Sequence, residues 1–380
     1  MSKHTPKAAD SSDSAPGEPK LAKYFKSLVK AGASDLHLKP SHSPHVRIGG
    51  RVRSAPGKAL SSKEIFSMVD EMMTDQQRAK FAELGNVDLA YELPGSDRFR
   101  INAFLQRGEV AVAVRRVTRD IPDFKALHLP PVVESIAAGH QGLVLLSGPT
   151  GGGKSTTIAA LLQSINKSRS CHIVTLEDPI EYLYEGDKAL ISQREIGIDV
   201  PDFRTALKYV FREDPDVVLI GELRDLDTFS AALQVAETGH LVLGTVHASR
   251  ASQTIGRLMD LFPADARQRI RQLIAFNLRA IVCQKLLPSI AKGVDRVPAC
   301  EVLLVDHHIR KLIADGRDSD LEEAIRSHEL EGMQTFSKSL YDLIQSGMIG
   351  PDVAYDAAPN TDELQMMLKG ISASRAGLRG

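Results

Sequence analysis

The chain has 380 residues, enough for about two domains, each with its own hydrophobic core. Its 47 lysines and arginines nearly balance its 48 aspartates and glutamates, so the net charge does not point to nucleic acid or an acidic membrane surface as a partner. Three cysteines without a C-x-x-C pair suit a reducing compartment and exclude a four-cysteine zinc site within one chain. Without a long apolar run or a hydrophobic N-terminal signal, we expect a cytoplasmic protein.

Composition changes along the chain indicate its organisation. Residues 1–20 are rich in Ser, Pro, Lys and Asp, which predicts a disordered tail. A small α+β domain is expected over 21–118, and 119–131, which contains three prolines, is typical of a linker. The remainder is expected to contain an α/β core, a mostly helical segment and a second disordered tail, at 132–287, 288–358 and 359–380.

The small domain begins with short strands expected at Asp35–Leu38 and His45–Ile48. A helix is expected after Ser61, because Ser61 and Glu64 have the spacing of a capping box and an apolar stripe follows them.

Two later strands, near Phe99–Gln106 and Glu109–Arg116, are expected to form a hairpin that turns on the two residues between them. This register places Arg100 directly opposite Arg115, and like charges that face each other across strands are destabilising. An anion bound between the two arginines would make their proximity favourable. A triphosphate shared with another subunit or domain could be that anion. A solvated basic face or a slipped register would also account for the pair.

The larger domain alternates apolar strands with helices, which predicts a mainly parallel sheet covered on both faces. Beyond about Leu287 the strand pattern fades into a mostly helical tail. The expected strands and helices are Leu143–Ser147, His172–Leu176, Val217–Ile220 and Leu241–Thr245, with helices such as Phe203–Phe211 and Thr228–Ala236.

The first of these strands runs directly into the pattern G-x-x-x-x-G-K-S, which predicts a nucleoside triphosphate site. The glycines let consecutive backbone N–H groups form a concave nest, Lys154 can reach the β and γ phosphates, and the Ser155 hydroxyl can coordinate Mg²⁺. A coincidental glycine loop is the alternative, but apolar residues at helical spacing behind the loop argue against it. The expected nucleotide-binding residues are Gly148, Pro149, Thr150, Gly151, Gly152, Gly153, Lys154, Ser155 and Thr156.

Hydrolysis also requires an acid on the metal side and a group that orients water. Glu222 follows the strand Val217–Ile220 and is our candidate for the acid beside Mg²⁺. Glu177 ends the strand that begins at His172 and is our candidate for activating water. Strand ends are also often acidic simply because the chain leaves the core there.

His240 and His247 flank the strand Leu241–Thr245, and His247 lies just past its end. A neutral imidazole at that point could hydrogen-bond to the γ phosphate or the catalytic acids and so sense the nucleotide state. The alternative is a buried histidine with satisfied hydrogen bonds. A zinc site is not expected, because this spacing puts the two rings at opposite ends of a strand.

These motifs, in this order, resemble the hexameric ATPases of the secretion superfamily, and within them the type IV pilus retraction class of PilT and PilU. The similarity runs from about residue 31 to about residue 358. The segments that carry it are Gly32–Leu38, Glu177–Glu181, Asp214–Asp225 and Thr238–His247.

The resemblance implies a RecA-like ATPase domain with a smaller PAS-like N-terminal domain, assembled as a homohexamer with ATP and Mg²⁺ at subunit interfaces. It implies that Glu177 is the general base, that Glu222 is the Walker B acid, and that Arg100 and Arg115 contact nucleotide. The implied function is retraction of a type IV pilus, which drives twitching motility. The implied partners are an inner-membrane platform protein, at whose cytoplasmic face the ring would sit, and a paralogous pilus ATPase.

The retraction class is favoured because the chain lacks the four-cysteine insert of assembly and secretion ATPases. Ile309–Ile313 resembles that class's A-I-R-N-L-I segment, although His308 and Lys311 depart from it. A related secretion, assembly or conjugation ATPase, and an accessory ring that binds nucleotide without hydrolysing it, are the alternatives. Nucleic acid is not expected as a partner, because no aromatic-rich basic stripe accompanies the site.

Overall fold

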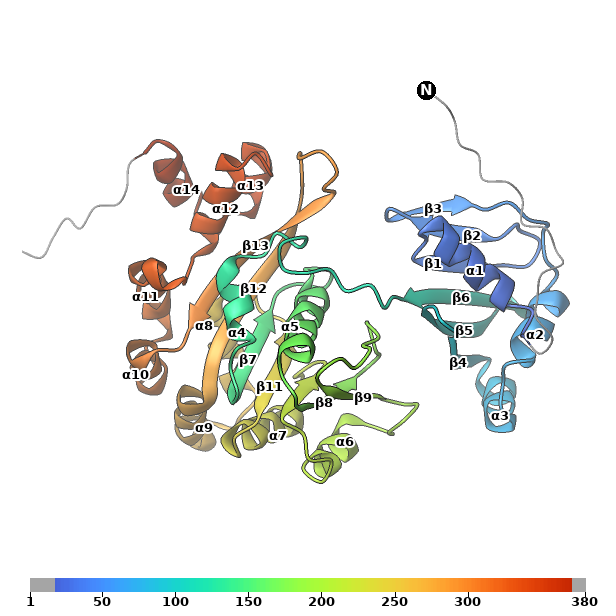
Figure 1. Ribbon diagram of the computed structural model, residues 1–380, viewed down its shortest axis with the longest axis horizontal. Coiled ribbons are helices and arrows are strands. Elements are labelled where there is room, and N and C mark those ends of the chain that lie inside the picture. Colours follow the sequence, from blue (N-terminus) through green and yellow to red (C-terminus); the bar gives the residue numbers. More distant parts are fainter. Residues whose placement is uncertain (1–17, 371–380) are drawn as a thin grey trace, which may run out of the picture. The chain divides into compact units, whose positions relative to one another are not determined.

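The computed structural model describes residues 18–370, so most of the expected N-terminal tail and the end of the C-terminal one lie outside the described residues. The chain divides into two compact units (Figure 1). The first unit extends to Asp120 and includes Glu181–Leu183, and the second unit contains the rest from Ile121 onward. None of the helices in the described part combines the length and apolar character needed to cross a membrane.

The first unit is built on a six-stranded antiparallel sheet in the order β3-β2-β1-β6-β5-β4. Phe25 stacks on Phe99 in its core, with ring centroids 4.4 Å apart. The two predicted short strands have the expected bounds, and the predicted capping box of Ser61 and Glu64 is confirmed. The elements are α1 (Ala22–Ala31), β1 (Asp35–Leu38), β2 (His45–Ile48), β3 (Arg51–Ser54), α2 (Ser62–Asp70), α3 (Asp75–Leu84), β4 (Asn86–Glu92), β5 (Arg98–Gln106) and β6 (Glu109–Val117).

Strands β5 and β6 form the predicted hairpin, and their register places Arg100 opposite Arg115. The turn residues Arg107 and Gly108 have φ angles of 51° and 79°, as a two-residue turn with both central residues in the left-handed region requires. The expected register is therefore confirmed, and the alternative of a slipped register is excluded.

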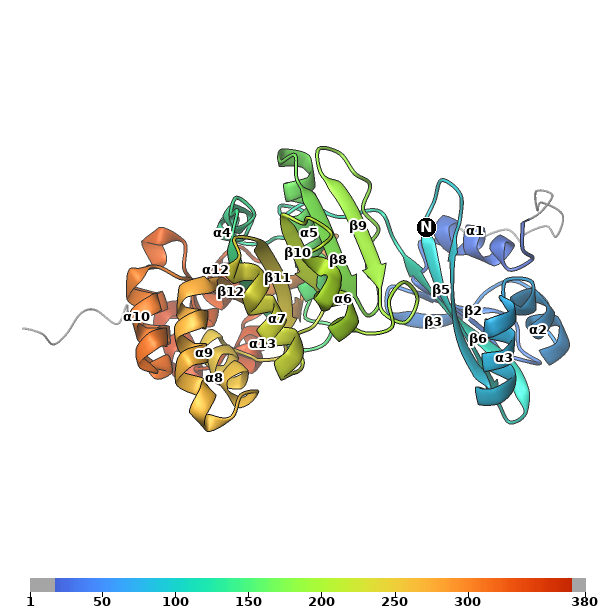
Figure 2. The ribbon, with the colours of Figure 1, turned by 90° about the horizontal axis from the view of Figure 1, so that it is seen from below.

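The second unit contains a seven-stranded sheet in the order β13-β12-β7-β11-β10-β8-β9, with β9 at one edge (Figure 2). All neighbours are parallel except β12 and β13, which confirms the expected α/β class. Its strands are β7 (Gly142–Ser147), β8 (His172–Glu177), β9 (Leu190–Glu195), β10 (Val217–Ile220), β11 (Leu241–Val246), β12 (Leu278–Pro288) and β13 (Arg296–Leu304).

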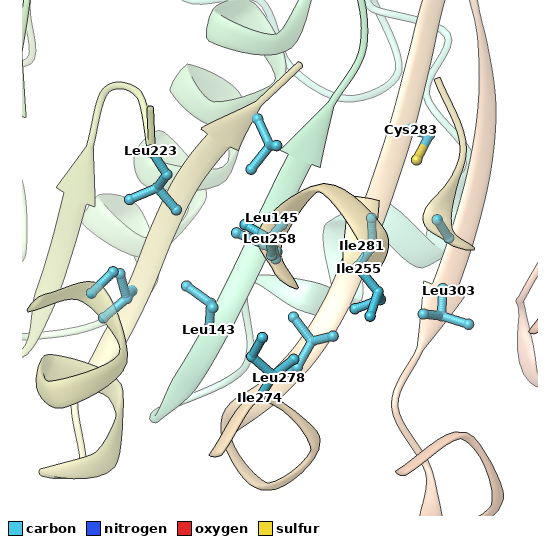
Figure 3. Packing of buried hydrophobic residues seen from close by; sticks show 14 of the residues in the cluster. Leu143, Leu145, Leu223, Ile255, Leu258, Ile274, Leu278, Ile281, Cys283 and Leu303 are labelled. Atoms are coloured by element: carbon cyan, nitrogen blue, oxygen red, sulfur yellow. The ribbon is translucent and has the colours of Figure 1, made fainter. Parts of the chain in front are cut away.

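Helices cover both faces of this sheet. Along β7, Leu143 and Leu145 belong to one hydrophobic cluster, and Val144 and Leu146 belong to the other, so an uninterrupted apolar run is what the strand requires. On the face that carries Leu143 and Leu145, helices α8 and α9 pack against β7 and β12 (Figure 3). The helices are α4 (Pro131–Ile136), α5 (Lys154–Ser168), α6 (Phe203–Val210), α7 (Leu226–Glu237), α8 (Ala251–Asp260), α9 (Ala264–Asn277), α10 (His307–Asp315), α11 (Leu321–Ser327), α12 (Phe336–Gln345), α13 (Pro351–Ala357) and α14 (Thr361–Leu368), with short 3₁₀ helices at Asp318–Asp320 and Glu329–Glu331.

Three expectations about the ends of this unit are corrected. The strand pattern does not end near Leu287, because Arg296–Leu304 forms β13 and pairs with β12. The expected linker packs largely with the second unit, because Phe124 and Leu129 are buried in its core. The expected C-terminal tail contains helix α14, which buries Leu364 completely. In the expected linker and the expected C-terminal tail, a few buried apolar side chains are enough to attach the chain to the second unit. Composition alone does not reveal such side chains.

Candidate nucleotide site

The glycine-rich loop at the end of β7 is packed so closely that it tolerates no side chains at key positions. Gly148 and Gly153 have φ angles of 146° and 90°, in the region that favours glycine. A Cβ atom would lie 2.3 Å from the Gln284 carbonyl oxygen at Gly148 and 2.4 Å from the Gln284 side-chain nitrogen at Gly153. Gln284 belongs to β12, the neighbour of β7, so the loop is shaped by a strand far away in sequence.

Helix α5 begins directly after this loop, and no side chain caps its N-terminus. Its first N–H groups and its dipole therefore favour an anion at this point. Ser155 is exposed in the first turn, whereas Lys154 is buried. The Lys154 ammonium donates to the carbonyl oxygens of Gly148 at 2.8 Å and Pro149 at 3.0 Å. Burial lowers the pKa of Lys154, and the nearby charge of Glu222 opposes that change.

The acidic candidates lie at the same edge of the sheet as the loop. Strands β7, β11, β10 and β8 are consecutive neighbours and parallel, so their C-terminal ends meet at one edge. Glu177 ends β8 and Glu222 follows β10, and Gly221 N–H donates to the Leu176 carbonyl between them at 2.8 Å. This edge is where open α/β sheets bind ligands.

Glu222 lies between the side chains of Arg224 and His247. One of its carboxylate oxygens lies 3.2 Å from His247 Nε2, and the other accepts from Arg224 at 2.6 Å. Partial burial acts to raise the pKa of Glu222, but the Arg224 hydrogen bond and the charges of Arg224, His247 and Lys154 outweigh it, so the pKa is lowered. The carboxylate is therefore ionised at neutral pH, as a metal-side acid must be.

His247 and His240 lie at opposite ends of β11, and only His247 contacts a predicted catalytic acid. His240 Nδ1 lies 3.0 Å from both the Thr238 hydroxyl and the Val235 carbonyl, which makes it a locally hydrogen-bonded histidine. The two rings therefore do not share a metal.

Glu177 is 6% exposed, and its carboxylate accepts a hydrogen bond from the Thr175 hydroxyl at 2.7 Å. Gln193 on β9 lies 3.5 Å from the same carboxylate oxygen. Sequence reasoning did not identify Thr175, although a lone hydroxyl inside an apolar strand was a signal. It also missed Arg224, which lies within the Asp214–Asp225 segment, and Gln284, for which the sequence contains no signal.

The arginine pair of the first unit has an internal counter-charge that sequence reasoning did not foresee. Strand β1 lies beside β6, and Arg115 Nε donates to a carboxylate oxygen of Asp35 at 2.9 Å. The same carboxylate lies 3.4 Å from Arg47 and accepts from the Ser34 hydroxyl at 2.7 Å. Burial acts to raise the pKa of Asp35, but Ser34 and the two arginines lower it. Arg115 therefore already has a counter-charge in Asp35, and Arg100 is the better candidate of the two for contact with an external anion.

Comparison with known proteins places these features in a family. The family model of type II/IV secretion system proteins matches residues 10–347. The chain belongs to this family. It is 39% identical over 330 residues to the type IV pilus retraction ATPase PilT of Pseudomonas aeruginosa, a match that covers 87% of this chain and 95% of that protein. It is 37% identical over 354 residues to the type IV pilus ATPase PilU of the same organism, covering 93% and 92%.

A crystal structure of the pilus retraction motor PilT with bound ADP superposes with a TM-score of 0.83 at 40% identity. The match covers 91% of this chain and 98% of that one. The second unit thus has the RecA-like ATPase fold that the family resemblance implied.

Proposed function

We propose that this protein is a motor ATPase that powers retraction of a type IV pilus and thereby twitching motility. The observation that carries the proposal is the meeting of the phosphate loop, Glu222 and Glu177 at one sheet edge, in a chain similar to PilT along nearly its whole length. Deletion of the gene should leave cells with surface pili that no longer retract. Loss of the pili themselves would instead indicate an assembly or secretion motor.

The residues present fit a magnesium–ATP complex. The exposed Ser155 hydroxyl and the ionised Glu222 carboxylate are hard oxygen donors of the kind that Mg²⁺ prefers, with Glu222 reaching it directly or through water. Bound Mg²⁺ would neutralise phosphate charge. The loop Gly148–Gly153 and Lys154 would hold the phosphates, and Glu177, fixed by Thr175, would orient and deprotonate the attacking water.

A ring of six would supply the remaining charge. In this arrangement Arg100 and Arg115 reach nucleotide from the first unit, and the boundary near Asp120 acts as the hinge. The ring would act at the cytoplasmic face of the inner membrane on a platform protein of the pilus, alone or with a paralogous ATPase.

A surface groove of about 480 Å³ lies beside the segment that departs from the retraction class, and Arg310 and Lys311 of that segment line it.

Arg100→Ala tests this assembly. We expect kcat for ATP hydrolysis to fall by about tenfold to a hundredfold, because an arginine that neutralises transition-state charge is lost while Arg115 remains. The control is Arg53→Ala, which removes an exposed arginine from β3 of the same unit. Turnover at the wild-type rate in an assembled Arg100→Ala ring would contradict the role of this side chain.

A further inference from the structure

Arg250 lies where the loop after β11 meets the C-terminal helices. The loop begins with His247, which contacts Glu222, and ends at Arg250, the residue before α8. Its middle is fastened to the end of the phosphate-loop strand, because Ser147 Oγ donates to the Ala248 carbonyl at 2.8 Å and accepts from Ala248 N–H at 3.0 Å. A displacement of the end of β7 would therefore move the loop 247–250 with it.

A buried carboxyl group lies beside Arg250. The Arg250 side chain does not cap the N-terminus of α8. Instead, the Glu301 carboxyl group of β13 accepts a hydrogen bond from Ala251 N–H, in the first turn of α8, at 2.7 Å. Glu301 is 2% exposed, and its second oxygen lies 3.8 Å from Arg250 Nε. Burial raises the pKa of Glu301, and the charges of Arg250 and Lys285 oppose that change. Arg250 therefore lies beside a buried acid of β13.

The other end of the guanidinium reaches the C-terminal helices. Arg250 forms an ion pair with Glu322 of α11, and Glu322 lies 3.9 Å from Arg326. Arg326 pairs with Glu363 of α14 at 2.7 Å, and Glu363 accepts from the Ser337 hydroxyl of α12 at 2.5 Å. Five side chains, the last of them Ser337, thus connect the loop that carries His247 to three helices.

We propose that Arg250 is a positioning residue that couples the nucleotide state sensed at Glu222 and His247 to the helices α11 and α14, through its ion pair with Glu322. The proposal rests on the proposed ATPase function. The loop cannot shift without either carrying Glu322 with it or breaking that ion pair, so the position of α11 depends on the nucleotide. Without the pair, hydrolysis and the C-terminal helices would be uncoupled.

Glu322→Gln is the test, because it weakens the link to α11 and leaves Arg250 beside Glu301. The control is Glu323→Gln on the same helix, which contacts Arg326 but not Arg250. We expect Glu322→Gln to lower kcat about three- to tenfold with KM for ATP unchanged, a size typical of coupling residues. Glu323→Gln should keep wild-type kinetics, and both variants should melt within a few degrees of the wild type.

Hydrogen–deuterium exchange distinguishes coupling from a purely structural role of the Arg250–Glu322 ion pair, because a structural role would not make the exchange depend on the bound nucleotide. In the full-length protein, exchange over 321–327 and 361–368 should differ between the ADP state and the state with a non-hydrolysable ATP analogue. Glu322→Gln should abolish that difference while the loop 247–250 still responds. An unchanged difference in Glu322→Gln, an equal loss in Glu323→Gln, or no difference in the wild type would overturn the inference. A wild type that binds but does not hydrolyse ATP would refute the proposed function instead, and the exchange comparison would still decide this inference.

Discussion

Lys154→Ala is expected to abolish ATP hydrolysis and to leave the fold intact. The ammonium group is the only side-chain cation within the glycine loop and the first turn of α5, and it already points at the loop, where it donates to two carbonyl oxygens. Removing a charge aimed at the transferred phosphate should reduce kcat/KM by about 10³-fold or more. Stability should change by less than about 1 kcal/mol, because burial already disfavours the charged form of this lysine.

A phosphate-release assay with purified protein measures this loss, and circular dichroism reports the fold. Lys167→Ala is the matched control, because Lys167 is exposed in the last turn of the same helix. Hydrolysis at the wild-type rate in Lys154→Ala would remove the phosphate loop from the reaction and with it the proposed motor.

Glu177→Gln is the second large effect that we expect. A neutral amide keeps the shape of the side chain and can still accept from Thr175, but it cannot take a proton from the attacking water. We expect kcat to fall by about 10²- to 10⁴-fold, the range for loss of a general base. Affinity for ATP should stay within about threefold of the wild type, because no phosphate contact is assigned to this residue.

Single-turnover kinetics with labelled ATP measures the rate of hydrolysis, and an equilibrium binding experiment measures the affinity for ATP. Glu181→Gln changes an exposed carboxylate of the same Glu177–Glu181 segment and should leave kcat unchanged. If Glu181→Gln lost turnover and Glu177→Gln kept it, the base would have to be reassigned.

Local patterns predicted the parts of this protein whose signals are short in sequence. These parts are the capping box at Ser61, the hairpin register of Arg100 and Arg115, and the apolar strand before the phosphate loop, and the residues that specify each of them lie within one short stretch of the chain. The same holds for the acids, since a carboxylate directly after an apolar strand lies at the edge of the sheet wherever that strand pairs.

The wrong expectations concern segments whose partners are remote. Strand β13 is an exception, because its partner β12 is the preceding strand and most of its own residues are apolar and buried; sequence reasoning missed it. The 119–131 segment is expected to be a linker and the region around Leu364 a disordered tail, yet a few apolar side chains attach both to cores formed by other elements.

The sequence by itself determined which chemistry the chain carries: a glycine loop for phosphates, a lysine behind it, and carboxylates at strand ends. Only the tertiary structure decided how these groups are held and charged. Thr157 meets Gln284 across 127 residues of sequence, Asp35 neutralises Arg115 across 80, and Arg250 joins Glu301 and Glu322 from three separate elements. The reason is physical: local geometry follows from backbone preferences over a few residues, whereas packing and ion pairing depend on which distant segments the folded core brings together.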